Sequence, residues 1–170
     1  MDEIATMVRP FAGDVWCHAP ATEPFRIDAL AREDDGLDRW SVPGLRTTYL
    51  ARDRSVAVAE YSRHAAVAGA DERHVIRLRA EGLTVLDARE SDVAGLLGIA
   101  MPHTLLDRSV TRAATARVRS SGACHGLIVP SVAFLDDPDR WNLVVFCERL
   151  GRLESYLAAV GEAGRIQLGD

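Results

Sequence analysis

Short apolar runs and one clear alternation of apolar and charged positions predict a chain rich in β-strands. Residues 74–80 alternate in this way, as the two faces of a half-buried strand do. Glu81-Gly82 follows them and predicts a turn. Apolar, aromatic or β-branched composition predicts the other strands, at 14–20, 47–51, 83–87, 126–130 and 141–148.

Helical spacing predicts helices between several of these strands. Asp53 suits the N-cap of a helix in which Val56, Ala57 and Glu60 follow at helical spacing. Residues 28–38 are polar, with little apolar periodicity, and predict a surface connection. The other predicted elements are a helix over 91–99 with a Ser/Asp cap, a helix over 105–119, a short helix over 153–160 and a last strand near Ile166.

The order of these elements favours an α+β fold over a doubly wound sheet, because strands and helices do not alternate regularly. A length of 170 residues predicts a single compact domain. We expect a mixed or antiparallel β core over roughly 15–148, flanking helices, a short N-terminal extension and a C-terminal tail. The chain is 48% hydrophobic, which is enough to form a packed core.

Charge and composition exclude several functions. A net charge of −5 argues against nonspecific binding to nucleic acid or to an anionic membrane. All 20 basic residues are arginines, so no lysine can form a Schiff base or serve a P-loop. No apolar run has the length of a membrane span, and the acidic start is unlike a signal peptide. We therefore expect a cytoplasmic protein.

Nothing in the sequence predicts a metal site or a common nucleotide-binding loop. The three cysteines form no CxxC pair, and the histidines at 74, 103 and 125 have no partner at metal spacing. Sparse, unpaired cysteines suit a reducing cytosol. Neither GxGxxG nor GxxxxGK[ST] occurs.

Three segments carry the residues best suited to chemistry. They are Asp38-Arg39-Trp40-Ser41-Val42-Pro43-Gly44, then Thr48-Tyr49-Leu50-Ala51 followed by Ala57 and Glu60, and later Val129-Pro130-Ser131. In order and spacing they resemble the RES-domain family, named for its Arg, Glu and Ser, over roughly 15–146. The resemblance implies an ADP-ribosyltransferase-like fold and a bacterial toxin that consumes NAD and is restrained by an antitoxin.

The resemblance also implies a role for each matched residue. Glu60 is the expected catalytic glutamate, because cleavage of the nicotinamide–ribose bond develops positive charge on the ribose. Arg39 is expected to bind the diphosphate of NAD, for which a planar guanidinium is suited. Tyr49 is expected to stack on nicotinamide or reach the ribose, and Ser131 to hydrogen-bond the substrate. Trp40 is expected to help bind the nucleotide.

The sequence departs from the family pattern at two points. Ser41 stands where an asparagine is most often found. Cys17, in Trp16-Cys17-His18, stands where an early arginine is usual, so either Arg26 takes over its binding role or the role is absent. A thiol pair of Cys17 and His18 is a rival hypothesis, but adjacent strand residues point to opposite faces. His64, one turn after Glu60, is expected to lie at the surface or to face the same cleft.

Three functions remain open on sequence alone. The first is degradation of NAD, the expected substrate, by hydrolysis or phosphorolysis, as the toxin of a toxin–antitoxin pair. The second is transfer of ADP-ribose from NAD to a protein side chain. Alternatively, the domain binds a nucleotide or a partner without turnover. The expected protein partner is a cognate helix-turn-helix antitoxin. The acceptor, the identity of the antitoxin and the oligomeric state, homodimer included, are left open.

Overall fold

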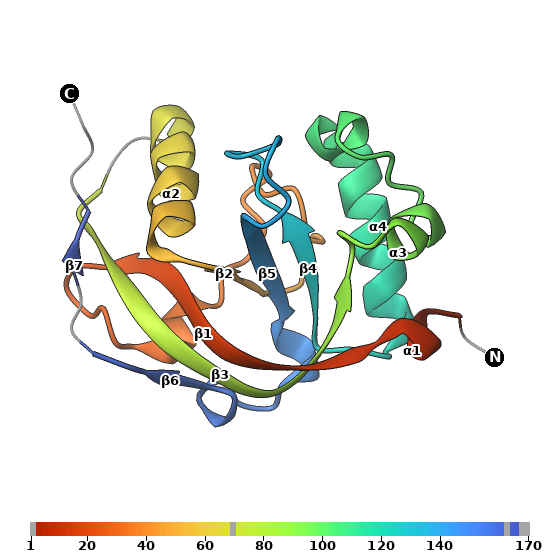
Figure 1. The fold of residues 1–170 in the computed structure, drawn as a ribbon. Helices are drawn as coiled ribbons and strands as arrows, with labels where there is room; N and C mark the ends of the chain where they lie inside the picture. The colour runs from red at the N-terminus through yellow and green to blue at the C-terminus, as the bar shows by residue number, and fades with distance from the viewer. Residues whose placement is uncertain (1–2, 69–70, 162–163, 167–170) are drawn as a thin grey trace.

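The computed structural model describes residues 3–68, 71–161 and 164–166, which form one mixed sheet with helices around it (Figure 1). The helices are α1 (Glu3–Met7), α2 (Arg54–Ala68), α3 (Ser91–Leu96) and α4 (Arg108–Ser121). The strands are β1 (Arg9–Pro20), β2 (Thr47–Ala51), β3 (Arg73–Asp87), β4 (Gly126–Pro130), β5 (Trp141–Phe146), β6 (Leu157–Ala159) and β7 (Gly164–Arg165). Short 3₁₀ helices lie at Ile27–Leu30, His103–Leu106, Cys147–Arg149 and Leu153–Ser155. The predicted α+β class is confirmed.

The strand pairing curls the sheet back on itself. The strand order is β1-β2-β5-β4-β3-β6, and β1 also pairs with β3 along most of its length. The pairing between β3 and β4 is parallel, and the other pairings are antiparallel. In Figure 1 the long strands β1 and β3 curve beneath the shorter strands β2, β5 and β4. The upper ends of β4 and β5 therefore lie between α2 on one side and α4 on the other.

The central strands are buried on both faces, on one side by helices and on the other by the strands β1 and β3: Ile128 of β4 packs in one apolar cluster with Val15 and Leu83. All five residues of β4 are buried, and its Leu127 packs with Val118 of α4 in one apolar cluster. Tyr61 and Val56 of α2 pack with Ala51 and Val75 in another cluster. Because α4 covers one face of β4 and the strands β1 and β3 cover the other, β4 is a continuous apolar run without alternation.

The turn predicted at Glu81-Gly82 is wrong, because β3 runs straight through it. The register between β1 and β3 shifts between Phe11↔Leu83 and Gly13↔Ala80. One extra residue of β3 is accommodated there, and Gly82 has φ of +70°, which a glycine adopts without strain. The glycine therefore marks a bulge that bends the strand, and the first strand is longer than expected because β1 pairs across this bulge.

The helix predicted over 153–160 is also wrong. A 3₁₀ turn at Leu153–Ser155 leads into β6, which pairs with β3 at Ala80↔Leu157. The edge of β3 has unpaired backbone groups, and pairing satisfies them better than a short isolated helix would. The last strand, predicted near Ile166, is β7, which pairs with β3 at Val75↔Gly164.

Other boundaries shift by a few residues. The α4 helix starts at Arg108 because Asp107 caps it, accepting a hydrogen bond of 2.8 Å from the backbone N–H of Ser109. The α3 helix ends at Leu96, and no Ser/Asp side chain caps it within the described residues. The connection at 28–38 contains a 3₁₀ helix, and its Arg32 forms an isolated bridge with Thr47.

Candidate active site

Glu60 lies on α2, on the side of the helix that faces β5. The helix starts as predicted: the carboxylate of Asp53 accepts a hydrogen bond of 3.0 Å from the backbone N–H of Val56. Val56, Ala57 and Tyr61 are buried against the sheet. This packing fixes the rotation of α2 and turns the half-buried Glu60 toward the upper ends of β4 and β5.

Two side chains from neighbouring strands bind one oxygen of Glu60. The Ser131 hydroxyl donates to Glu60 Oε1 at 2.5 Å, and the Asn142 amide donates to the same oxygen at 3.0 Å. Residues 129 and 142 are paired between β4 and β5, so the ends of these strands present both donors together. No hydrogen bond to Oε2 is found among the described residues, and this oxygen remains available to a ligand.

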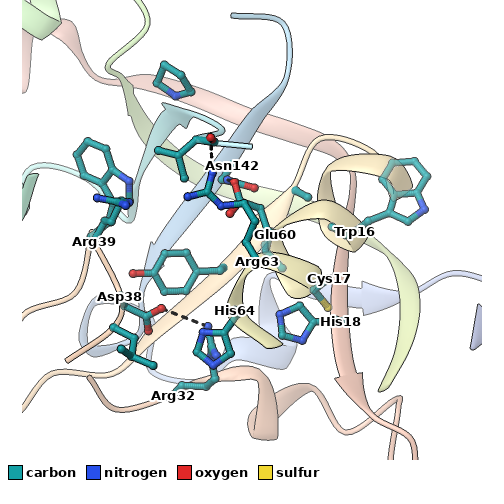
Figure 2. Close-up of a pocket in the computed structure, with 18 of the residues that line it drawn as sticks. Trp16, Cys17, His18, Arg32, Asp38, Arg39, Glu60, Arg63, His64 and Asn142 are labelled. Atoms are coloured by element: carbon teal, nitrogen blue, oxygen red, sulfur yellow. Dashed lines mark hydrogen bonds and ion pairs between the residues drawn. The ribbon is translucent and has the colours of Figure 1, made fainter. Parts of the chain in front are cut away.

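A pocket of about 180 Å³ opens beside Glu60 (Figure 2). Four arginines line it, together with aromatic and small apolar side chains. Its lining includes Trp16, Cys17, His18, Arg32, Leu37, Asp38, Arg39, Trp40, Tyr49, Leu50, Ala51, Ala57, Glu60, Arg63, His64, Arg108, Pro130, Val132 and Asn142. Such a concave, partly apolar site with few convergent polar groups is typical of a small-molecule binding site.

Arg39 is held in place from two sides. Its guanidinium donates to the backbone carbonyl of Leu106 at 2.7 Å, and its own carbonyl accepts from the Thr111 hydroxyl of α4 at 2.9 Å. Burial lowers the pKa of Arg39, as do the nearby charges of Arg108 and Arg63, whereas Glu60 raises it. Three guanidinium groups thus gather near one carboxylate, which suits a ligand with more than one negative charge.

Tyr49 and Trp40 contribute aromatic surface to the pocket. Burial raises the pKa of Tyr49, and the charge of Asp38 raises it further, so the hydroxyl keeps its proton. Trp40 is 4% exposed and packs into the same apolar cluster as Phe146, so most of its ring is a core side chain. The structure therefore brings Tyr49 and Trp40 to the pocket with Arg39 and Glu60. Ser41 is buried and does not line the pocket.

Arg26 lies away from the pocket. Its side chain is 56% exposed, and its guanidinium pairs with Glu23 at 2.9 Å and Asp28 at 3.2 Å. Arg32 lines the pocket beside Cys17 instead, and its charge acts on Cys17 and His18. The binding role expected for Arg26 is not supported by this arrangement, because its donors already bind exposed carboxylates.

The Cys17–His18 pair is unsuited to thiol catalysis. Burial raises the pKa of Cys17 to about 12, and burial lowers the pKa of His18 to about 3, with Arg32 adding to the shift at His18. The thiol therefore keeps its proton and the imidazole stays neutral, whereas a catalytic pair needs a thiolate. His64 does face the pocket, and its Nε2 lies 3.9 Å from a carboxylate oxygen of Asp35.

No group of three or more His, Cys, Asp or Glu side chains within the described ranges is arranged to hold a metal ion. None of the helices in the described part of the chain is both long and apolar enough to cross a membrane.

Sequence reasoning missed several pocket residues. Asn142 is the only asparagine of the chain and stands near the start of an otherwise apolar strand. A single polar residue in such a strand could have marked it as a site residue. Arg63 follows Glu60 by three residues and so shares its helix face, with a hydrogen bond to the carbonyl of Val132. Arg108 and Arg32 carry no sequence signal, and Asp38 stands in the motif segment beside Arg39 without an expected role; only the tertiary fold brings these three side chains to one pocket.

The fold and pocket define an α+β domain with a supported glutamate and an arginine-lined cavity. The sequence model of the RES domain matches residues 9–166. The chain belongs to the RES domain family.

One similar solved structure is a chain of the M. tuberculosis MbcT–MbcA toxin–antitoxin complex. The TM-score is 0.73 at 17% identity, and the alignment covers 97% of this chain and 92% of that one. At this identity the likeness concerns the fold. The sequence matches no curated protein.

Proposed function

We propose that this protein is an NAD-degrading toxin of a toxin–antitoxin pair, which cleaves the bond between nicotinamide and ribose. The observation that carries the proposal is Glu60, with one oxygen bound by Ser131 and Asn142 and the other open to a pocket lined by arginines. Family membership supports the same reading. The proposal includes an ADP-ribosyltransferase-like fold and a single RES-like domain over 1–170.

Cleavage of this bond needs an ionised carboxylate near the ribose but no general acid for the leaving group. When the C–N bond breaks, its electron pair goes to the nicotinamide nitrogen, so the cationic ring leaves as a neutral molecule. Positive charge develops on the ribose, as in other glycosidic cleavages. The open oxygen of Glu60 would stabilise that charge, and the two hydrogen bonds on the other oxygen would keep the carboxylate in place.

The remaining pocket residues would bind different parts of NAD. Arg39, with Arg63 and Arg108 nearby, suits the diphosphate. Tyr49 offers a flat ring for nicotinamide, and the largely buried Trp40 adds apolar surface to the pocket lining. Ser131 is buried, and its hydrogen bond to Glu60 supports a positioning role rather than direct contact with the substrate.

An antitoxin and a cytosolic site of action complete the proposal. The similar fold in a toxin–antitoxin complex supports an antitoxin as the protein partner. We propose a helix-turn-helix antitoxin, encoded beside this gene. An enzyme that consumes NAD inside the cell needs such a restraint.

The direct test uses purified protein freed of any partner. The protein is incubated with NAD, with and without inorganic phosphate, and the products are separated by chromatography. Release of nicotinamide is expected. Free ADP-ribose as the other product indicates hydrolysis, a phosphorylated ADP-ribose indicates phosphorolysis, and label on protein from radioactive NAD indicates transfer. Intact NAD under all conditions would refute the enzyme reading and favour a binding module.

A growth test addresses the toxin role separately. Expression of the wild type from a tightly controlled promoter is expected to stop growth and lower cellular NAD. Glu60→Gln, produced at the same level, is expected to leave both unchanged. Equal growth of the two strains, with soluble protein in each, would contradict the toxin role.

A further inference from the structure

A second charged pair lines the pocket, separate from Glu60 and its donors. The Arg32 guanidinium lies 3.7 Å from Asp38 Oδ1, and the two side chains are 30% and 13% exposed. Figure 2 shows this pair on the opposite side of the pocket from Glu60 and Asn142. The pocket therefore presents a donor and an acceptor side by side, away from the carboxylate proposed for catalysis.

The backbone on both sides of the pair is fixed. Arg32 exchanges two hydrogen bonds with Thr47, at 2.9 and 2.8 Å, which anchors it next to β2. The carbonyl of Asp38 accepts a hydrogen bond of 2.9 Å from Arg112 of α4, and Arg112 is itself paired with Asp34 at 2.8 Å. Groups held in this way are preorganised for a ligand.

The protein does not satisfy the hydrogen-bonding groups of the Arg32 guanidinium and the Asp38 carboxylate where they face each other. A separation of 3.7 Å is too long for a hydrogen bond. Within the described residues, neither the guanidinium of Arg32 nor the carboxylate of Asp38 has a shorter polar contact. Burial raises the pKa of Asp38, and Arg32 offsets part of that shift. A largely buried carboxylate without a donor is costly, so a ligand that supplies a donor would be bound favourably.

We propose that Arg32 and Asp38 together recognise the carboxamide of nicotinamide, Arg32 donating to its carbonyl oxygen and Asp38 accepting from its N–H. This assignment rests on the proposed function, since it names the group that selects NAD as the substrate.

A primary carboxamide matches the pair in chemistry. It offers one acceptor and one donor side by side in a plane, the complement of a guanidinium beside a carboxylate. The Arg32 guanidinium also lies 5.5 Å from the centre of the Tyr49 ring. A pyridine ring stacked on Tyr49 would therefore carry its substituent next to the pair.

The pair fits other parts of the substrate less well. A phosphate would be attracted by Arg32 but repelled by Asp38, whereas Arg39 has no ion-pair partner within the described residues and suits phosphate better. A carboxylate in place of the carboxamide would set two negative oxygens against each other, and this repulsion gives the pair its selectivity.

The test compares NAD with deamidated NAD, in which nicotinic acid replaces nicotinamide. Wild type is expected to cleave NAD with a kcat/KM about 10²-fold or more higher, because the analogue loses one hydrogen bond and gains a repulsion. In Asp38→Asn the amide can donate to the carboxylate of the analogue. We expect the preference for NAD to fall below about 10-fold. Arg32→Met is expected to lower kcat/KM for both substrates.

Asp35→Asn is the matched control. Asp35 lies three residues away on the same segment, is 43% exposed and does not line the pocket. It should keep the preference of the wild type. A measurement without any variant guards against misfolding of Asp38→Asn: free nicotinamide should inhibit the wild type at lower concentration than nicotinic acid does.

The outcomes separate the inference from the proposed function. Equal cleavage of NAD and its deamidated form by wild type would overturn the carboxamide assignment and leave the NAD-degrading activity standing. The same holds if folded Asp38→Asn keeps the full preference. Failure of the wild type to cleave either compound would overturn both.

Discussion

Asn142→Ala tests the architecture around Glu60 at a residue that the sequence motif does not include. The substitution removes the hydrogen bond of 3.0 Å to Glu60 Oε1 and leaves the bond from Ser131 in place. Glu60 should then sample more orientations, and its open oxygen should face the ribose less often. We expect a lower kcat with little change in KM, because Asn142 acts through Glu60 rather than through substrate binding.

The expected loss of kcat follows from the negative charge of Glu60, which accepts the hydrogen bond. A hydrogen bond to a charged group contributes about 1.5–3 kcal/mol. At about 1.4 kcal/mol for each tenfold change in rate, kcat should fall by about 10-fold to about 10²-fold. Ser131→Ala should have an effect of similar size. Because both donors bind the same oxygen, the losses in the double variant should not simply add.

Asn142→Asp separates positioning from packing. The shape is nearly unchanged, but a second carboxyl group is placed against Glu60, and two neighbouring carboxyls share a proton. We expect a larger loss than for alanine, and a partial recovery as the pH is lowered.

The assay is steady-state release of nicotinamide, with melting temperatures to show that each variant is folded. Ser121→Ala is the control for Ser131→Ala, since among the described residues the Ser121 hydroxyl bonds only to the carbonyl of Val118 and the backbone N–H of Ala123, at the end of α4. A folded Asn142→Ala with a wild-type kcat would refute the positioning role.

Two further predictions concern a basic and a neutral pocket residue. Arg39→Ala should mainly raise the KM for NAD, and Arg39→Lys should restore it only in part because an ammonium cannot bind two oxygens in the same way; a change confined to kcat would contradict this. Burial lowers the pKa of His18 to about 3 in the folded protein, against 6.5 in the unfolded chain. Between these pH values the unfolded state binds more protons, so the free energy of unfolding should fall as the pH drops from 6.5 toward 3. Denaturant titrations should show His18→Gln losing less stability over this window, by at most about 1.4 kcal/mol per pH unit, while the exposed His103→Gln follows the wild type.

The strands were predicted well from the sequence because their signals are local. The alternation at 74–80 and the apolar run at 126–130 appear as expected in β3 and β4. The errors arise where pairing with a distant strand decides the outcome. Gly82 became a bulge because of the register with β1, and the tail became β6 because the edge of β3 was open.

The same distinction holds for the site. The residues of the motif, Glu60, Arg39 and Tyr49, line one pocket, and Ser131 bonds to Glu60 beneath it. The bond from Asn142, however, depends on the register between β4 and β5, which sequence does not reveal. The pairing of Arg32 with Asp38 likewise depends on the bridge to Thr47 and the anchor from α4. Arg26 lies outside the pocket and pairs with the exposed carboxylates of Glu23 and Asp28, so its expected binding role stays a prediction that this arrangement does not support.

The central claim is that the carboxylate of Glu60 stabilises the ribosyl cation formed from NAD. The most direct test is the kcat for nicotinamide release by wild type and by Glu60→Gln, with Glu81→Gln on the exposed part of β3 as a control. Glutamine keeps the shape and loses the charge, so kcat should fall by about 10² or more with little change in KM. The control should match the wild type. A folded Glu60→Gln enzyme that releases nicotinamide at a near-normal rate would contradict the claim.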